Sequence, residues 1–498
     1  MLLAQPINRD ASEDDQPPFT TLRRTLNLPP PTSSSNAYTH GFPGSSYSTT
    51  TTVTLAVDPK NSTTPISKAS GNNAIKDRPP PSYPQSSPLD VALIETNGVH
   101  EEVFAALVHS FGSKPEARLH FYKEEPRYDI QGIVAEFELW QEPPEWQAWE
   151  ALQRDDIGYH PSILILITCY SDPLRLASRL RRLLEEGKTF IYCVVHETAR
   201  WDGPDPDLDE ILKPWAQKGL LDFIVLSPAV ARTLEEKGMR TWPRRGAHKV
   251  PRSVRTFPPI FPVRLPPLPA IVEDQDDGIH MNNSFAIQGI FDPERRNFEV
   301  TFAHLERFIN DKAKQMNDST PAPLEDTMQK PEPPYPIEHS PVHLHLIGHG
   351  EERPKIPERL RQNIFIHENL NYHDFYNLLS QQSALLPAFS SDKYRWMKAS
   401  SSIACSLIAG TPLVVDENIL RAYSYLGEDA VYVQKNKETE FDALGKVLEG
   451  SYDHVVEKRR RVRLRASQVI EQNKGQAREW ITKAGVEIGR YRDGHESG

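Results

Sequence analysis

The sequence predicts an α/β protein with two Rossmann-like, doubly wound domains and a disordered N-terminal tail. Short apolar strands alternate with helical segments in two separate series along the chain. Strands that are apolar along their whole length, interleaved with helices, are typical of parallel sheets covered on both faces. A Pro-rich and acidic segment lies between the two series and is typical of an extended connector. The tail is rich in Pro, Ser and Thr and has no helical or alternating periodicity.

These patterns divide the 498 residues into five parts. We expect a disordered tail over residues 1–87, a first domain over 88–258, a linker over 259–282, a second domain over 283–480 and a C-terminal tail over 481–498. A Pro-rich and acidic stretch at 312–340 is expected to be a disordered insertion in the second domain.

The first domain begins with an apolar strand at residues 91–94, followed by a turn and a helix at 101–111. Further strands are expected at 130–137, 163–168, 190–195 and 223–226, with helices at 173–186, 207–217 and 229–237. This alternation predicts one parallel sheet with helices on both faces.

The second domain repeats the alternation. Strands are expected at 285–290, 343–347, 364–367, 385–386, 413–415 and 431–433, and helices at 297–310, 372–382, 398–408 and from 438 onward. Two such domains joined by a linker predict a cleft that faces the carboxyl ends of the strands, where open parallel sheets bind ligands.

Composition excludes several classes of protein. The net charge of −11 argues against a general nucleic-acid binder. No apolar run approaches the ~20 residues of a membrane span, and the N-terminus does not have the pattern of a secretory signal, so we expect a cytoplasmic protein with no integral membrane span. The three cysteines, Cys169, Cys193 and Cys405, have apolar neighbours and no C-x-x-C spacing, which favours buried thiols over a disulfide framework or a zinc site.

The run KRRRVRLR, from Lys458 to Arg465, is strongly basic. Such a run is usually the solvated face of a helix, and contact with an acidic surface is the alternative.

Two strand–loop–helix junctions of the second domain carry groups that suit anions. Ser400, Ser401 and Ser402 open the helix at 398–408 beside Lys398, and a helix N-terminus offers N–H groups to an anion. Arg295 and Arg296 follow the strand that ends near Gly289, and arginine binds phosphate oxygens in pairs. An ordinary capped helix and a pair of surface arginines are the alternatives. In a parallel sheet both junctions open on the same rim, which favours a diphosphate site.

Four further positions lie at expected strand ends. Gly98 allows a ligand to approach the first turn closely, although a plain turn has the same need for glycine. His196 follows a strand and is a candidate for contact with a reacting ligand, or is simply solvated. Asp416 and Glu417 either contact hydroxyl groups of a ligand or cap the next helix.

At these residues the chain resembles the retaining glycosyltransferases of the GT-B fold. The segment 289–296, GIFDPERR, is similar to their G-R-L-x-P-x-K-G junction, and AGTPLVV at 409–415 is similar to their A-G-x-P-V-V segment. NLNYHD at 369–374 through Tyr376, then Leu386 and Pro387, resemble their next strand, helix and loop. In the first domain VVHE at 194–197 and VLS at 225–227 resemble strand ends of the same family.

The resemblance implies transfer of a sugar from a nucleotide-sugar donor to an unidentified acceptor, with retention, without a metal and without a further cofactor. The family usually carries two glutamates that hold sugar and ribose hydroxyls, at positions where this chain has Met397 and Cys405. A catalytically inactive binding or scaffold protein is therefore the alternative, and an epimerase or a phosphorylase of the same fold is a third possibility. The resemblance assigns catalytic roles to His196, Arg295 and Lys398, and substrate binding to Gly98, Gly289, Arg296, Ser400, Ser401, Ser402, Asp416 and Glu417.

Overall fold

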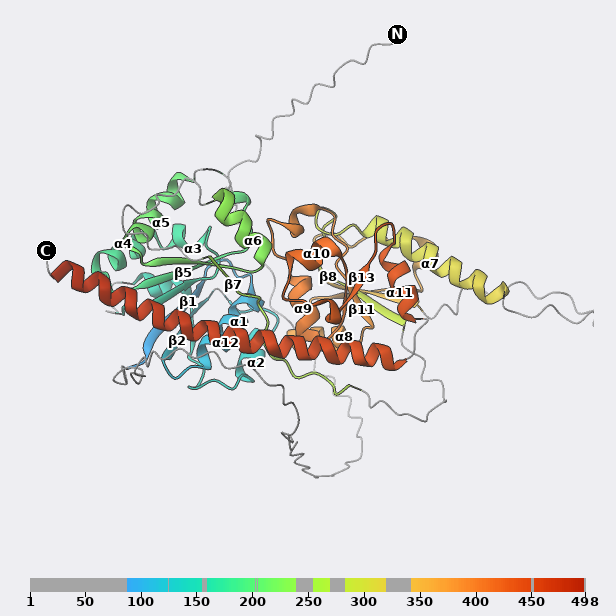
Figure 1. The fold of residues 1–498 in the computed structure, drawn as a ribbon, viewed down its shortest axis with the longest axis horizontal. Coiled ribbons are helices and arrows are strands. Elements are labelled where there is room, and N and C mark those ends of the chain that lie inside the picture. The colour runs from blue at the N-terminus through green and yellow to red at the C-terminus, as the bar shows by residue number, and fades with distance from the viewer. Residues whose placement is uncertain are drawn as a thin grey trace, which may run out of the picture. The chain divides into compact units, whose positions relative to one another are not determined.

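The structure is a computed structural model that describes residues 87–268, except 124, 155–158, 202, 204 and 239–253, together with residues 283–318, 342–448 and 452–496. The expected tail up to residue 86, most of the expected insertion and the second half of the linker lie outside these described residues. All described residues belong to one unit of the chain, residues 82–498. Figure 1 shows its two parallel sheets, one in the blue and green part of the chain and one in the yellow to orange part.

The first sheet has seven strands in the order β3-β2-β1-β4-β5-β6-β7, and every neighbouring pair is parallel. Its strands are β1 (Leu89–Glu95), β2 (Ala117–Lys123), β3 (Trp146–Gln147), β4 (Ile163–Leu166), β5 (Phe190–Val195), β6 (Leu221–Val225) and β7 (Val254–Thr256). The α-helices between them are α1 (Glu101–Gly112), α2 (Ile130–Ala135), α3 (Asp172–Arg175), α4 (Ala177–Glu186), α5 (Pro206–Lys218) and α6 (Pro228–Thr233). The central strands β4 and β5 are buried at every residue, which is what their unbroken apolar sequences require.

The second sheet has six strands in the order β10-β9-β8-β11-β12-β13, again all parallel. Its strands are β8 (Asn283–Ile290), β9 (Val342–His349), β10 (Ile364–Glu368), β11 (Ala384–Leu386), β12 (Leu413–Asp416) and β13 (Val431–Gln434). Its α-helices are α7 (Phe298–Asp318), α8 (Tyr372–Ser380), α9 (Ser401–Ala409), α10 (Glu417–Ala422), α11 (Glu440–Leu448) and α12 (Tyr452–Glu496). The predicted fold class, two doubly wound α/β domains, is confirmed.

Each sheet contains one point where the strand order reverses. In the first sheet β1 lies between β2 and β4, and in the second sheet β8 lies between β9 and β11. The loops after β1 and β4, and after β8 and β11, therefore leave toward opposite sides and open a crevice at the carboxyl ends of the strands. This topology determines where a ligand site is expected.

Several predicted elements differ from those observed. The predicted strand at 130–137 is the helix α2, because the carboxylate of Asp129 accepts a hydrogen bond from the N–H of Gly132 and caps the helix. The sequence analysis missed β2, whose apolar residues alternate with charged ones because one of its faces is partly exposed. The helix predicted to end at residue 310 continues as α7 to Asp318, so the predicted insertion begins within it.

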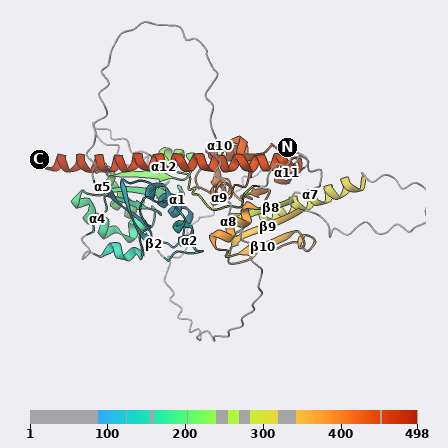
Figure 2. The ribbon, with the colours of Figure 1, turned by 90° about the horizontal axis from the view of Figure 1, so that it is seen from below.

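The C-terminal helix α12 extends from Tyr452 to Glu496 without a break at residue 480, where a separate tail was predicted. It packs on α1 of the first domain and on α9 of the second, and Figure 2 shows its course in red. Trp480 is buried against the rings of Phe111 and Tyr192, and its carbonyl accepts a hydrogen bond from the Tyr192 hydroxyl at 2.8 Å. These contacts continue past the predicted boundary, since Ala484 is also buried.

Two residues of the basic run form hydrogen bonds with other parts of the chain. Lys458 donates to the carbonyl of Val431 at 3.1 Å, and Arg463 donates to the carbonyl of Pro266 at 2.8 Å. Contact of this run with an acidic surface stays a prediction. Within the described residues, no helix combines the length and the apolar character that crossing a membrane requires.

The prediction for the cysteines was wrong in one respect. Cys169 and Cys193 are joined by a disulfide, with their Cα atoms 5.1 Å apart, whereas Cys405 is a free, buried thiol. The two bonded residues are 24 positions apart, and only the pairing of β4 with β5 brings them together.

Candidate functional site

A cavity of about 690 Å³ opens at the carboxyl ends of both sheets. The first domain contributes the loop after β1, the N-terminus of α1 and the residues that follow β5. The second domain contributes the loops after β8, β9 and β10 and the N-terminus of α9. The cavity therefore lies at the strand-order reversals of both sheets, as the topology leads one to expect.

The three serines at the start of α9 have different surroundings. Ser400 is the N-cap, and its hydroxyl accepts a hydrogen bond from the N–H of Ser402. The Ser402 side chain is fully buried and donates to the carbonyl of Gln288 at 3.2 Å, so it does not line the cavity. Ser401 is exposed and lines the cavity, as does Ser400. The start of α9 therefore contributes Ser400 and Ser401, and not Ser402, to the cavity lining.

The two arginines after β8 have separate roles. Arg296 is buried, and it donates to the carbonyl of Gln288 from Nε at 3.1 Å and from Nη2 at 2.9 Å, and to Ser402 Oγ at 2.9 Å. These bonds tie the loop after β8 to α9. Arg296 also lines the cavity, and its role as a phosphate ligand stays a prediction. The side chain of Arg295 is 43% exposed and lines the cavity, with Asp292 Oδ2 3.4 Å from its Nε.

Gly289 keeps this arrangement possible. Its φ of +134° is rare for residues with a side chain, and a Cβ there would lie 2.5 Å from Nη2 of Arg296. Gly289 lines the cavity, and its lack of a side chain leaves room for the buried guanidinium of Arg296.

Lys398 lies where the two domains meet. Its Nζ is 2.8 Å from Oε2 of Glu197, a residue that follows β5 of the first domain. Backbone hydrogen bonds flank this ion pair, since the N–H of Thr198 donates to the carbonyl of Met397 and the N–H of Ala399 donates to the carbonyl of His196. Lys398 is thus held at the cavity wall by the opposite domain.

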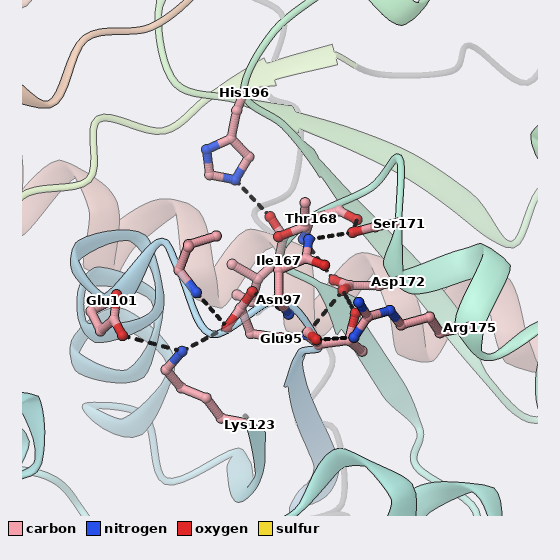
Figure 3. A network of polar contacts seen from close by, with 12 residues as sticks. Glu95, Asn97, Glu101, Lys123, Ile167, Thr168, Ser171, Asp172, Arg175 and His196 are labelled. Atoms are coloured by element: carbon pink, nitrogen blue, oxygen red, sulfur yellow. Dashed lines mark hydrogen bonds and ion pairs between the residues drawn. The ribbon is translucent and has the colours of Figure 1, made fainter. Parts of the chain in front are cut away.

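His196 lines the cavity and stacks on His100, with ring centroids 3.7 Å apart. Its Nε2 is 2.7 Å from the carbonyl of Ile167 (Figure 3). Burial, with a smaller contribution from the charge of Lys398, lowers the pKa of His196 to about 4, although the hydrogen bond to Ile167 acts in the opposite direction. A carbonyl only accepts, so the neutral ring carries its proton on Nε2 and has Nδ1 left as an acceptor. Burial also lowers the pKa of His100, well below its usual range.

A buried ion pair supports the loop after β1. Nζ of Lys123 is 2.6 Å from Oε2 of Glu95 and 3.7 Å from Oε1 of Glu101 (Figure 3), and neither Lys123 nor Glu95 exposes any of its side chain. The carboxylate of Glu95 also accepts hydrogen bonds from the N–H groups of Asn97, at 2.8 Å, and Val99, at 3.2 Å. The loop that carries Gly98, whose φ is +65°, is thereby fixed at the cavity wall.

Asp172, the first residue of α3 after β4, anchors the same loop. Its Oδ1 accepts hydrogen bonds from the N–H and hydroxyl of Thr96, and its Oδ2 accepts from the N–H of Thr168 (Figure 3). Burial raises the pKa of Asp172 to about 7, although these hydrogen bonds act in the opposite direction. The loops at the strand-order reversal of the first sheet are therefore connected by a buried polar network.

The sequence analysis missed a group of cavity residues. Two of them, Glu101 and Glu102, begin α1. The sequence could have indicated them, because they lie at the start of the helix that follows the first strand. The others come from segments that only the tertiary fold brings together, and they include Arg127, Tyr128, His349, Asn369, Tyr372 and Tyr394.

Asp416 and Glu417 do not line the cavity, and Asp416 has the alternative role of a helix cap. Asp416 caps α10 by accepting a hydrogen bond from the N–H of Ile419 at 2.8 Å, and Arg395 donates to its other oxygen at 2.6 Å. Their position at the end of β12, away from the reversal between β8 and β11, explains this outcome.

The two positions where the resemblance expects glutamates also lie outside the cavity lining. Cys405 is fully buried on α9, and Met397 contributes its carbonyl to the contact with Thr198. In the part of the chain that the structure describes, no group of three or more His, Cys, Asp or Glu side chains is arranged to hold a metal ion.

Comparison with known proteins gives similarity in structure without similarity in sequence. No protein-family model and no curated protein matches the chain. A crystal structure of HepE from Anabaena with UDP and glucose matches 79% of this chain and 100% of its own, with 10% identity and a TM-score of 0.48. The N-terminal domain of the trehalose-6-phosphate phosphatase of Candida albicans matches 80% of this chain and 97% of its own, with 11% identity and a TM-score of 0.48.

The apo form of the lipopolysaccharide outer core galactosyltransferase WaaB matches 78% of this chain and 99% of its own, with 13% identity and a TM-score of 0.42. Likenesses with TM-scores below 0.5 support no statement about the substrate of this chain. Its two parallel sheets are established by their own strand pairing.

Proposed function

We propose that this protein is a glycosyltransferase that binds a nucleotide sugar in the cavity and transfers the sugar to an acceptor. The observation that carries the proposal is the convergence of Arg295, Lys398 and the N-terminus of α9 on one cavity at the strand-order reversals of both sheets. Two cationic side chains and a helix N-terminus favour a diphosphate, because each stabilises negative charge.

The same groups suit the chemistry of glycosyl transfer. The bond between the anomeric carbon and the diphosphate oxygen breaks, and the negative charge that develops on the diphosphate is stabilised by Arg295, Lys398 and the α9 N–H groups. The acceptor oxygen bonds to the anomeric carbon, and its proton passes to the departing diphosphate if configuration is retained. Retention and independence of metal follow from the family resemblance and stay predictions.

His196 is proposed to orient the acceptor or the reacting sugar. Its ring is neutral near pH 7 and has Nδ1 left to accept a hydrogen bond from a hydroxyl. The carbonyl of Ile167 fixes the ring, so a hydroxyl that reaches Nδ1 would be held in one orientation.

The experiment is titration calorimetry of UDP, GDP and ADP with the whole protein and its variants. Arg295→Ala and Lys398→Ala are expected to weaken binding of the preferred nucleotide about tenfold or more each, since each removes a charge-assisted hydrogen bond. Arg361→Ala is the matched control, because Arg361 is exposed on the same domain, pairs with Glu358 and does not line the cavity. Unchanged binding in both cavity variants would refute the phosphate assignment.

One observation favours the second candidate, a binding or scaffold protein without catalysis. The position of the second expected glutamate is the buried Cys405, which cannot reach a ligand in the cavity. Such a protein would bind without turning over any nucleotide sugar, and release of nucleoside diphosphate from UDP-glucose, GDP-mannose or ADP-glucose distinguishes the two. It would also bind a partner protein through residues 1–87, a prediction that deletion of this segment tests.

A further inference from the structure

The cavity contains three carboxylate side chains from the first domain, Glu101, Glu102 and Glu197. Two of them have cations close by: Glu197 is 2.8 Å from Nζ of Lys398, and Glu101 is 3.7 Å from Nζ of Lys123. Among the described residues, no Lys, Arg or His forms an ion pair with Glu102. Glu102 is thus the cavity carboxylate whose charge is not balanced by a neighbouring ion-pair partner.

The surroundings of Glu102 belong to both domains. It lies in the first turn of α1 and lines the cavity together with Tyr372, the first residue of α8 in the second domain. The Tyr372 hydroxyl, as a hydrogen-bond donor, acts to lower the pKa of the Glu102 carboxyl group. Tyr372 is buried, and its backbone N–H donates to the carbonyl of Tyr128, so its ring has a fixed place. One hydroxyl can donate one hydrogen bond, whereas a carboxylate has about four acceptor positions. Glu102 lines the cavity, where the remaining positions are available to a ligand.

A carboxylate with open acceptor positions suits a ligand with several hydroxyl donors. Adjacent hydroxyls of a sugar ring donate in parallel to the two oxygens of one carboxylate, and a hydrogen bond to a charged group is among the stronger ones. A phosphate would be repelled, so this end of the cavity differs from the end with Arg295 and Lys398. Burial and the neighbouring Glu101 raise the pKa of Glu102 to about 7, which agrees with a carboxyl group that has no ion-pair partner.

We infer that Glu102 is a recognition residue that binds a pair of adjacent hydroxyls on the nucleotide sugar, either of its ribose or of the sugar to be transferred. The inference rests on the proposed function and names the residue that recognises the uncharged part of the substrate. Glu102 would supply a carboxylate for hydroxyl binding in place of the glutamate that the resemblance expects at position 405, where this chain has a buried cysteine.

The experiment compares Glu102→Gln with the wild-type protein in calorimetric titrations at pH 8, using the pairs UDP and UDP-glucose, GDP and GDP-mannose, and ADP and ADP-glucose. Glutamine has nearly the same shape but no charge. If the bound hydroxyls belong to the transferred sugar, the affinity for the nucleotide sugar falls about tenfold while that for the nucleoside diphosphate is unchanged. If they belong to the ribose, both affinities fall by the same factor.

Glu185→Gln is the matched control, since Glu185 is exposed on α4 of the same domain and does not line the cavity. If Glu102→Gln does not melt cooperatively, Glu102→Asp serves in its place, because it keeps the charge but withdraws it by one methylene group, and it is expected to weaken the same ligands.

If Glu102→Gln binds the nucleoside diphosphates and the nucleotide sugars as tightly as the wild-type protein does, this inference is overturned and the proposed function is left intact. Absence of binding of every nucleotide to the wild-type protein would instead refute the proposed function, and this inference with it.

Discussion

Replacement of Lys123 by methionine tests whether the buried network supports the cavity wall. Lys123 and Glu95 have no exposed side-chain surface, and their charged atoms are 2.6 Å apart. Lys123→Met keeps much of the aliphatic volume but leaves the Glu95 carboxylate buried without a cation. Glu95 then has only the N–H groups of Asn97 and Val99 as hydrogen-bond donors.

The expected loss is large relative to the stability of a typical domain. Removal of one partner from a buried ion pair costs about 3–5 kcal/mol, because an uncompensated charge stays in the interior. The free energy of unfolding of natural domains is only about 5–15 kcal/mol. Glu101, 3.7 Å from Nζ of Lys123, loses the same cation, which places the expected value in the upper part of the range.

The measurement is equilibrium urea unfolding of the wild-type protein, Lys123→Met, Glu95→Gln and the double variant at pH 7. The free energy of unfolding of the double variant is expected to be about 2 kcal/mol higher than that of Lys123→Met, because a neutral amide at position 95 leaves no unpaired charge in the interior. A loss below about 1 kcal/mol in Lys123→Met would refute the reasoning, as would a double variant no more stable than that single variant.

Two further predictions concern the other cavity carboxylates. Glu197→Gln is expected to strengthen binding of the preferred nucleoside diphosphate several-fold in calorimetry, because Lys398 loses its ion-pair partner at 2.8 Å, and weaker binding would contradict this. Glu102→Gln is expected to change how stability depends on pH. Burial raises the pKa of folded Glu102 from 4.5 to about 7, so its contribution to wild-type stability is lost as pH rises from about 4.5 to 7. Between pH 5 and pH 8 the free energy of unfolding of the variant, measured with urea, should rise by up to about 3 kcal/mol relative to that of the wild type. A difference between the two proteins that does not change with pH would contradict the pKa shift.

The order of strands and helices was predictable because it depends on local sequence. Unbroken apolar runs such as β4 and β5 predict buried parallel strands, and Gly410, with a φ of +67°, ends α9 where the sequence indicated. β2 and α2 were not predictable in the same way. β2 has one partly exposed face and loses the apolar signal, and α2 depends on one capping carboxylate.

The candidate site was predictable only at the level of loops. The position of Arg295 and Lys398 at a common rim follows from parallel topology and was inferred from sequence. Both arginines line the cavity, but packing makes them different: Arg296 is buried and donates to the carbonyl of Gln288, whereas the side chain of Arg295 is 43% exposed. Glu102 was not predicted, because its significance arises from Tyr372, 270 residues further along the chain.

The most direct test of the proposed function is a crystal structure of the protein with a bound nucleoside diphosphate, chosen among UDP, GDP and ADP by calorimetry. The diphosphate is expected to lie between Arg295, Lys398 and the N–H of Ser401, with Nζ of Lys398 moved from Glu197 to a phosphate oxygen. A diphosphate bound away from these three groups, or a nucleotide bound outside the cavity, would contradict the proposed function.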